Sequence, residues 1–515
     1  MKMKKHPAYF LMLLVCWLLT MAPVAGQDHI KTLDNYFARA LTDWQVPGMA
    51  VAIVKDGEII FAKGYGVQEY GQQQKVDKHT NFAIASNTKA FISAALARLV
   101  WEGKISWDDN VVKYLPYFAL YDAYATRHAT IRDLLSHRLG LGTFSGDVIW
   151  YKSTYSAEEV VKHIRYIPQA YDFRAGYGYA NVMFITAGEV IKAVTGRPWD
   201  EFLHKQFFAP LNMDRTVTSV KALPAMNNIA SPHKTIAGRI TPIPWANWDN
   251  MGAAGGIISN VDDMARWLIL QMNHGLNGAD TLFSPEVQVD MWTPHNNHKV
   301  SLAAQKDIPS RHFSAYGLGW GISDYQGRKM VAHGGGYDGM FSRVTMIPEE
   351  HLGIVVLTNA MTGIATPITM RAIDEILGTG NRDWSKEALS RATKSAQRKQ
   401  ERINRRVKAR ISGTRPTLPL SAFTGQYADP FYGQVNIVME NDHLVIDFVP
   451  APDLKADLSH WHYNTFKLEW REVHAWFDFG TLQFVLNNNH QVTGIVFDVP
   501  NDDIFFEEIH LQKIN

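Results

Sequence analysis

One serine–lysine pair in this chain has a spacing suited to nucleophilic catalysis. Ser86 and Lys89 are three residues apart at the start of a segment, residues 88–102, whose apolar pattern predicts a helix. Residues three apart share one face of a helix, so the two side chains would lie one turn apart. A serine hydroxyl attacks a carbonyl once a base takes its proton, and burial lowers the pKa of a lysine enough for it to be that base. The pair therefore predicts acyl-transfer chemistry at Ser86.

A Ser-x-x-Lys pattern arises readily by chance, and the chain contains a second copy at residues 231–234. That copy has Pro232 at its second position, in a segment without helical periodicity, so it is predicted to be a loop. The prediction for Ser86 therefore depends on companion residues elsewhere in the chain.

Tyr179 and Asn181 form the only Tyr-x-Asn in the chain. They lie between an aromatic, glycine-containing loop at residues 173–178 and an apolar segment at residues 182–195 that predicts a helix. A phenol beside ammonium groups can have a lowered pKa and exchange protons, and an asparagine amide can hold a substrate carbonyl. Taken alone, a core tyrosine beside a helix-capping asparagine explains the same pattern.

A third group of residues is His333-Gly334-Gly335-Gly336. Glycines let a substrate lie against a strand and leave a backbone N–H free to point at an oxyanion. A glycine-rich hairpin turn is the alternative interpretation.

In this order the three groups resemble the motifs of the serine β-lactamase-like family. That family contains class C β-lactamases, penicillin-binding DD-carboxypeptidases, D-aminopeptidases and esterases. Shorter segments match as well, and the resemblance covers roughly residues 30–378. The matching segments are residues 134–141, 254–267, 316–320 and 354–359.

The resemblance implies a role for each residue of the three groups. Ser86 would be acylated, Lys89 would be the general base, and Tyr179 would pass a proton to the leaving group and later help to activate water. Asn181 would orient the substrate amide. The backbone N–H groups of Ser86 and Gly336 would form the oxyanion hole. The remaining substrate-binding residues would be His333, Gly334 and Gly335.

The chain departs from the family's best-known pattern at His333. Its β-lactamases and transpeptidases usually have Lys-Thr-Gly there, whereas an imidazole is mostly neutral at pH 7 and Gly334 has no hydroxyl.

The predicted function is an exported serine hydrolase acting through a Ser86 acyl-enzyme on an ester or an amide, D-amino-acid peptides included. The alternatives are a β-lactamase or DD-carboxypeptidase, an acyltransferase using the same acyl-enzyme, and a non-catalytic wall-associated binding module.

The elements that position these groups are predicted from residues 28–378. Residues 48–61 predict a hairpin with an Asp-Gly turn, and residues 340–347 and 352–357 predict adjacent strands. Strands at both ends with helices between them favour an α+β domain whose terminal strands share one sheet. The resemblance implies a β-lactamase/transpeptidase-like fold, an antiparallel sheet flanked by helices with a helical subdomain.

Two further regions follow this domain. Residues 379–414 are rich in Lys and Arg and predict an exposed, basic helical linker. Residues 415–515 predict seven or eight short strands in a small antiparallel β-barrel, which resembles the lipocalin-like domain of some family members. We expect this barrel to narrow the active-site mouth or to mediate oligomerisation. Its predicted strands are residues 435–440, 444–448, 465–470, 474–478, 482–486, 492–498 and 504–509.

The N-terminus, residues 1–26, predicts a signal peptide. Three early lysines precede an apolar stretch and a run of small residues, with cleavage expected after Ala25 or Gly26. The chain is therefore expected to be periplasmic or secreted, with no integral membrane span after cleavage. Cys16 is the only cysteine, and the bulky residues before it disfavour lipidation. The mature chain would have no disulfide, cysteine nucleophile or zinc–thiolate site.

Composition indicates a globular protein of two or three domains. The chain has 515 residues, 46% of them hydrophobic, and a net charge of +1, which gives no field for nucleic acid. The histidine pairs 295/298 and 460/462 are in no ligand pattern, so neither metal nor cofactor is expected. The expected partners are a small-molecule or peptide acyl substrate and a second copy of the chain in a homo-oligomer.

Overall fold

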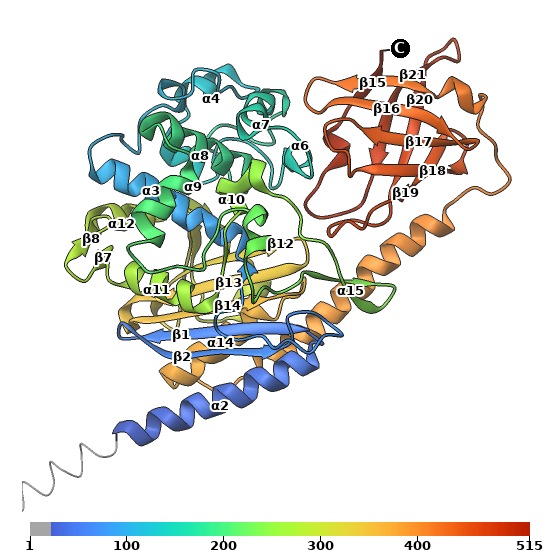
Figure 1. Ribbon diagram of the computed structural model, residues 1–515. Coiled ribbons are helices and arrows are strands. Elements are labelled where there is room, and N and C mark those ends of the chain that lie inside the picture. The colour runs from blue at the N-terminus through green and yellow to red at the C-terminus, as the bar shows by residue number, and fades with distance from the viewer. Residues whose placement is uncertain (1–21, 515) are drawn as a thin grey trace, which may run out of the picture.

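A computed structural model describes residues 22–514, which form a sheet-and-helix domain joined by a long helix to a β-barrel (Figure 1). Cys16 and most of the predicted signal peptide, residues 1–21, lie outside the described residues. The expected cleavage positions, Ala25 and Gly26, fall in the first turns of helix α2 (Ala22–Asp43).

The first domain is built on one eight-stranded antiparallel sheet. Its strand order is β2-β1-β14-β13-β12-β11-β10-β9, so strands from the two ends of the domain are neighbours, as predicted. The predicted Asp-Gly hairpin is confirmed by the β1/β2 pair. The strands are β1 (Gly48–Lys55), β2 (Glu58–Gly66), β9 (Asn296–His298), β10 (Ser314–Tyr316), β11 (Gly321–Tyr325), β12 (Arg328–Tyr337), β13 (Met340–Ile347) and β14 (Leu352–Thr358).

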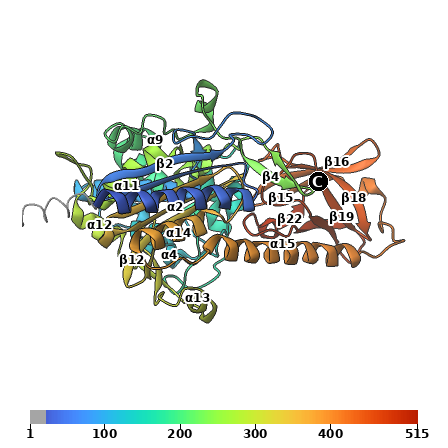
Figure 2. The same ribbon diagram turned by 90° about the horizontal axis from the view of Figure 1, so that it is seen from below.

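The central strands are buried on both faces, which explains their continuous apolar sequences. Every residue of β14 is buried, and so is every residue of β1 except the last. Helices α2 and α14 (Ala365–Leu377) cover one face, as Figure 2 shows. Helix α11 (Val261–Met272) packs on β1 and β14. The helical subdomain shares one buried apolar cluster with this helix. The sheet is thus a rigid middle layer that holds β12 in place.

The helical subdomain contains both helices predicted next to the motifs. Helix α3 (Thr88–Trp101) confirms the predicted helix at 88–102, and α8 (Asn181–Thr195) confirms the one at 182–195. Helix α8 ends at Gly196, which adopts the left-handed conformation that favours glycine. The second Ser-x-x-Lys is only partly a loop, because β4 (His233–Ile236) begins within it and pairs with β5 (Arg239–Pro242). That prediction was wrong for His233 and Lys234.

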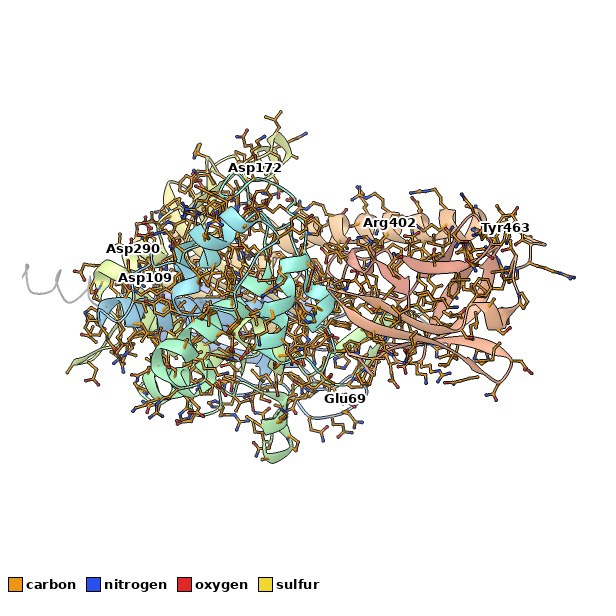
Figure 3. The ribbon with its side chains drawn as sticks, turned by 90° about the horizontal axis from the view of Figure 1, so that it is seen from above. Glu69, Asp109, Asp172, Asp290, Arg402 and Tyr463 are labelled. Atoms are coloured by element: carbon orange, nitrogen blue, oxygen red, sulfur yellow. The ribbon has the colours of Figure 1, made fainter. Side chains whose placement is uncertain are left out.

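The basic segment is helical, and the barrel follows it. Helix α15 (Trp384–Lys408) begins with a buried tryptophan beside α14 and then runs exposed to the barrel. Figure 3 shows Arg402 of α15 alongside the barrel and Tyr463 at the barrel end remote from the first domain. The barrel is closed, in the order β15 to β22. Its strands are β15 (Gly425–Asp429), β16 (Gly433–Glu440), β17 (His443–Phe448), β18 (Lys455–His462), β19 (Thr465–Trp470), β20 (Thr481–Leu486), β21 (Val492–Asp498) and β22 (Leu511–Lys513).

Two predicted barrel strands were wrong, and three strands, β15, β18 and β22, were missed. Residues 474–478 form a loop, and residues 504–509 contain a 3₁₀ turn (Phe506–Glu508). Their apolar side chains are buried by contacts between the two segments and not by strand pairing. Phe477 and Phe506 pack edge to face, with ring centroids 5.1 Å apart. The alternation of apolar and polar residues in these two segments therefore resembles that of a strand.

Candidate active site

Lys89 is fully buried and points at the nucleophile. A 3₁₀ turn (Ala85–Asn87) presents Ser86 at the start of α3, with Ala85 in the left-handed region at φ +48°. Lys89 Nζ lies 3.1 Å from Ser86 Oγ, 2.7 Å from Asn181 Oδ1 and 2.8 Å from the carbonyl oxygen of Ala254. A neutral amine can donate to the two carbonyl oxygens and keep its lone pair for the Ser86 hydroxyl proton.

Burial makes the neutral form of Lys89 accessible. It lowers the pKa of Lys89 to about 7, and the nearby Asp147 carboxylate opposes this only in part. A pKa lowered to about 7 makes the free base of Lys89 available near neutral pH, which general-base catalysis there requires.

Asn181 and Asp147 form a support behind Lys89. Asn181 accepts from Lys89 and donates through Nδ2 to Asp147 Oδ2 at 2.6 Å. Asp147 Oδ1 also accepts from the Trp150 indole at 2.8 Å. The Asn181 amide is therefore engaged at both ends, and its role in orienting a substrate amide stays a prediction. Asp147 is the first residue of the short helix α6 (Asp147–Trp150) and belongs to none of the three motifs, so no sequence pattern pointed to it.

Tyr179 lies beside the same pair, but its ionisation differs from the expectation. Burial raises the pKa of the Tyr179 phenol well above its usual value, although a hydrogen bond with Ser86 lowers it somewhat. The expected lowering of this pKa was wrong, because the effect of burial outweighs that of the hydrogen bond with Ser86. Lys89 Nζ lies 4.8 Å from the centroid of the Tyr179 ring. Near neutral pH Tyr179 is a phenol and can donate a proton.

The loop before Tyr179 is held by a buried carboxylate. Asp133 accepts from Arg138 Nε at 2.5 Å and from Arg174 Nη2 at 2.6 Å. Burial would raise the pKa of Asp133, but the hydrogen bond from Arg174 and the charge of Arg138 hold it below its usual value. This ion-pair network ties residues 171–178 to α5 (Ile131–Leu135) and so positions Tyr179.

His333 faces the site as a neutral imidazole. Its Nδ1 lies 2.6 Å from the Gly334 carbonyl, which can only accept, so Nδ1 carries the proton. Nε2 then accepts from the Tyr316 hydroxyl at 2.8 Å. Burial and the nearby Lys89 lower the pKa of His333 to about 3. Tyr316 begins one of the segments that resemble the family, residues 316–320, but the sequence did not indicate its contact with His333, which lies on a different strand.

The glycines let β12 pack against the turn that carries Ser86. A Cβ on Gly335 would lie 2.2 Å from the Ile84 carbonyl oxygen and 3.1 Å from Ala85 Cβ. Strand β11 pairs with β12 only as far as Ala332, whereas β13 pairs with β12 up to Tyr337. The edge of β12 from His333 onward therefore has no β11 partner beside Ser86. An oxyanion hole made by the Ser86 and Gly336 N–H groups stays a prediction.

A pocket of about 260 Å³ opens over Ser86. Ser86, Tyr179, Asn181, His333, Gly334 and Gly336 all line it, whereas Lys89 and Gly335 lie behind its wall. The barrel contributes three further lining residues, Trp476, Asp503 and Ile504. A larger cavity of about 850 Å³ at the junction of the two domains contains none of the predicted site residues. The active site is therefore assigned to the smaller pocket because Ser86 lines it, although its volume is the lower of the two.

Within residues 22–514, no group of three or more His, Cys, Asp or Glu side chains is placed to hold a metal ion. No described helix has the length and apolar character needed to span a bilayer.

Comparison with known proteins gives matches for both regions of the chain. A family model described as Beta-lactamase matches residues 33–376, and one described as a domain of unknown function (DUF3471) matches residues 409–513. The Unguisins hydrolase ungD′ of Aspergillus campestris is 31% identical over 443 residues, covering 81% of this chain and 80% of that protein. Protein flp of Staphylococcus aureus (strain MRSA252) is 27% identical over 341 residues, covering 64% of this chain and 63% of flp.

One solved structure shows a similar fold over nearly the whole chain. It is the octameric penicillin-binding protein homologue from Pyrococcus abyssi, with a TM-score of 0.62 and 20% identity. The match covers 94% of this chain and 100% of that one.

Proposed function

Because this chain belongs to the Beta-lactamase family and is a serine hydrolase, we propose that it cleaves an ester or an amide through an acyl-enzyme on Ser86. The observation that carries this proposal is the contact of 3.1 Å between Ser86 Oγ and a fully buried lysine amine. The pKa of that amine, lowered by burial to about 7, lets it take the serine proton at neutral pH.

The chemistry has two halves. In the first, Lys89 takes the proton of Ser86, Oγ bonds to the carbonyl carbon, and the leaving alcohol or amine departs with a proton from the Tyr179 phenol. Tyr179 regains its proton from the Lys89 ammonium. In the second half, water attacks the acyl carbon, gives up a proton through the same groups, and releases the acid and Ser86. The raised pKa of Tyr179 keeps the phenol protonated near neutral pH, so a proton is present there for the leaving group.

The oxyanion would be held by the backbone N–H groups of Ser86 and Gly336. Gly336 lines the pocket beside Ser86 on the free stretch of β12, which supports this arrangement. Losing one such donor typically costs two to three orders of magnitude in rate.

The neutral His333 favours substrates other than β-lactams. With a pKa of about 3, its imidazole supplies no cation for a substrate carboxylate at the position where β-lactamases usually have lysine. The relatives named as hydrolases support transfer of the acyl group to water. A β-lactamase or DD-carboxypeptidase, an acyltransferase and a non-catalytic binding module are the alternative functions, and the substrate and product of acylation distinguish them.

Intact-protein mass spectrometry tests the proposal. The wild type, exposed to p-nitrophenyl esters, D-alanyl amides and penicillin, should gain one acyl group on Ser86 from the esters or amides. The Ser86→Ala variant should gain none and lose at least about a thousand-fold in kcat. Ser231→Ala, in the second Ser-x-x-Lys, is the matched control and should behave as wild type.

Each other outcome points to a defined alternative. Persistent activity of Ser86→Ala on every substrate would contradict the proposal. Long-lived labelling by penicillin alone would favour the DD-carboxypeptidase alternative. A product formed only when an alcohol or amine acceptor is added would favour acyl transfer.

We also propose that the chain is exported and forms homo-oligomers. The basic and apolar pattern of residues 1–26 supports export. The octameric state of the Pyrococcus abyssi homologue is the ground for proposing oligomers. N-terminal sequencing of the mature protein and light scattering after size-exclusion chromatography test these two statements.

A further inference from the structure

Helix α15 carries a row of basic side chains along one face. Lys394, Arg398, Arg402, Arg405 and Lys408 follow one another at intervals of four, four, three and three residues. At about 100° per residue, these intervals keep all five side chains within an arc of about 120° around the helix axis. At a rise of about 1.5 Å per residue, the row is about 21 Å long. We call these five residues the basic stripe.

The cations of the basic stripe are exposed and free of acidic partners. All five residues are exposed, and within residues 22–514 no carboxylate forms an ion pair with any of them. The ion pairs of α15 are formed by other residues, such as Arg391 with Asp307 at 3.1 Å and Arg406 with Asp498 at 2.6 Å. The charges of the basic stripe are therefore available to a partner outside the chain.

The basic stripe is turned away from the barrel. Two other cations of α15 face the barrel. Arg406 pairs with Asp498 of β21, and Lys399 is close enough to Asp503 to oppose the rise in the pKa of that carboxyl. Both lie about 100° or more around the helix from the centre of the basic stripe. Figure 2 shows α15 at the edge of the molecule along the barrel, with no other element beyond it. The basic stripe is thus open to a large partner.

One acidic residue interrupts the basic stripe. Glu401 is the only Asp or Glu in residues 394–408, and it lies within the same arc. Five cations and this one carboxylate give the face a net charge of +4. Neighbouring cations are about 4.5–6 Å apart along the axis, which is less than the screening length of about 8 Å at physiological salt. The charges therefore act together on an anionic partner.

The shape and composition of the basic stripe fit a flat anionic surface. Cations within one arc of a helix reach a single plane together, whereas a free phosphate or one acidic side chain would meet only one or two of them. Residues 394–408 include no aromatic residue on which a nucleic-acid base could stack. The apolar residues Ile403 and Val407 lie on the opposite face of α15, so the basic stripe would meet headgroups and not acyl chains. A bilayer that contains anionic phospholipid presents such a surface.

We propose that the basic stripe docks this protein on the anionic headgroups of a phospholipid membrane. Each Lys or Arg near such a surface strengthens binding about fivefold, so five of them support a reversible contact that salt weakens. The pocket over Ser86 has no lining residue from α15, so docking would leave that site intact. Docking is a second property of the chain and does not depend on hydrolysis at Ser86.

Co-sedimentation with lipid vesicles tests the proposal. Full-length wild type is mixed with vesicles of phosphatidylcholine alone or with about one-third phosphatidylglycerol, at about 0.05 M and about 0.5 M salt. At low salt the wild type should bind the anionic vesicles at least about tenfold more tightly than the neutral ones, and at high salt this difference should vanish. Lys394→Gln/Arg398→Gln/Arg402→Gln should bind anionic vesicles about 100-fold more weakly, since three contributions of about fivefold are lost.

Matched variants separate docking from net charge and from folding. Lys75→Gln/Lys205→Gln/Lys299→Gln removes the same charge from exposed positions of the first domain and should lower binding less than about threefold. Glu401→Gln should strengthen binding about fivefold, a gain that a misfolded protein would not give. Glutamine preserves α15, because its helix propensity is close to that of Lys, Arg and Glu. All three variants should keep the wild-type rate on a soluble p-nitrophenyl ester.

Several results would overturn the proposal. They are a wild type that binds neither kind of vesicle, equal binding to neutral and anionic vesicles, and a triple variant of the basic stripe that binds anionic vesicles as tightly as wild type. A wild type that binds a short DNA duplex but no vesicle would assign the basic stripe to nucleic acid instead. Ester hydrolysis without vesicle binding would leave the proposed function standing, and vesicle binding without hydrolysis would leave docking standing.

Discussion

Lys89 is a buried amine, and its ionisation governs when Ser86 can react. Burial lowers the pKa of Lys89 to about 7, so its ammonium form, which cannot accept the serine proton, predominates below that pH. We expect kcat/KM for an uncharged p-nitrophenyl ester to rise with pH, to be half-maximal near pH 7 and to reach a plateau by about pH 9. The pKa of Tyr179 is raised, so its ionisation should not end this plateau.

This pH profile is checked by steady-state kinetics from about pH 5 to about pH 9, with Ser86→Ala subtracted as background. A profile that stays flat down to about pH 5 would show that the free base of Lys89 is not required. An uncharged ester is used so that the substrate itself adds no titration to the profile.

At the scale of elements, the lysine of the second Ser-x-x-Lys connects β4 to the barrel. Lys234 Nζ donates to the carbonyl oxygen of His474 and to Asp478 Oδ1, the latter at 2.6 Å. These residues flank Trp476, whose indole N–H donates to Asp338 at 2.9 Å and whose ring lines the pocket. Strand β4 thus holds the barrel loop that forms one wall of the site.

We expect Lys234→Met to loosen this loop and to raise KM about tenfold while changing kcat less. A hydrogen bond to a charged group contributes about 1.5–3 kcal/mol, enough to change the loop population by that factor. Steady-state kinetics on the best substrate measures KM and kcat separately for each variant. Lys221→Met, at an exposed lysine paired with Asp249, is the control and should leave KM unchanged. An unchanged KM in Lys234→Met would contradict the role given to the loop.

At the scale of the whole molecule, the two domains share one buried apolar cluster. Tyr151 of the first domain packs against Phe477 of the barrel, with ring centroids 5.9 Å apart. Glu508 adds the polar contact to Ser145 and Gly146. The barrel therefore forms part of the active-site wall and is not merely tethered by α15.

We expect Glu508→Ala to lower the free energy of unfolding by about 1–3 kcal/mol, because it leaves the buried donors of the first domain unpaired. Glu508→Gln should cost less, since its carbonyl oxygen can still accept one of them. Denaturant unfolding followed by tryptophan fluorescence measures both variants. Glu472→Ala, at an exposed barrel residue, is the control and should have no effect.

The pH dependence of this contact has a defined sign. Burial raises the pKa of Glu508, so the folded state holds its proton more tightly than the unfolded chain does. Stability from this group is therefore highest at low pH and falls as pH rises through the unfolded and then the folded pKa. The stability of Glu508→Gln relative to wild type should increase between about pH 4 and about pH 8. A decrease over that range would contradict the direction of the shift.

The sequence by itself determined the features that depend on neighbouring residues. The helical spacing placed Ser86 and Lys89 on one face, the Asp-Gly turn specified the β1/β2 hairpin, and Gly196 ended α8. Each follows from local backbone geometry, so a few residues suffice to predict it. The order of the three motifs then indicated the family, and residues 474–478 and 504–509 show where periodicity alone failed.

Only the tertiary structure decided the environment of these residues. The lowered pKa of Lys89, the raised pKa of Tyr179 and the proton position on His333 depend on burial and on partners that the fold brings beside them, such as Asp147 and Tyr316. The same holds for Asp503, which reaches the pocket from a barrel loop at the other end of the chain. Desolvation and charge interactions act through space, so they are set by which surfaces the fold brings together and not by spacing along the sequence.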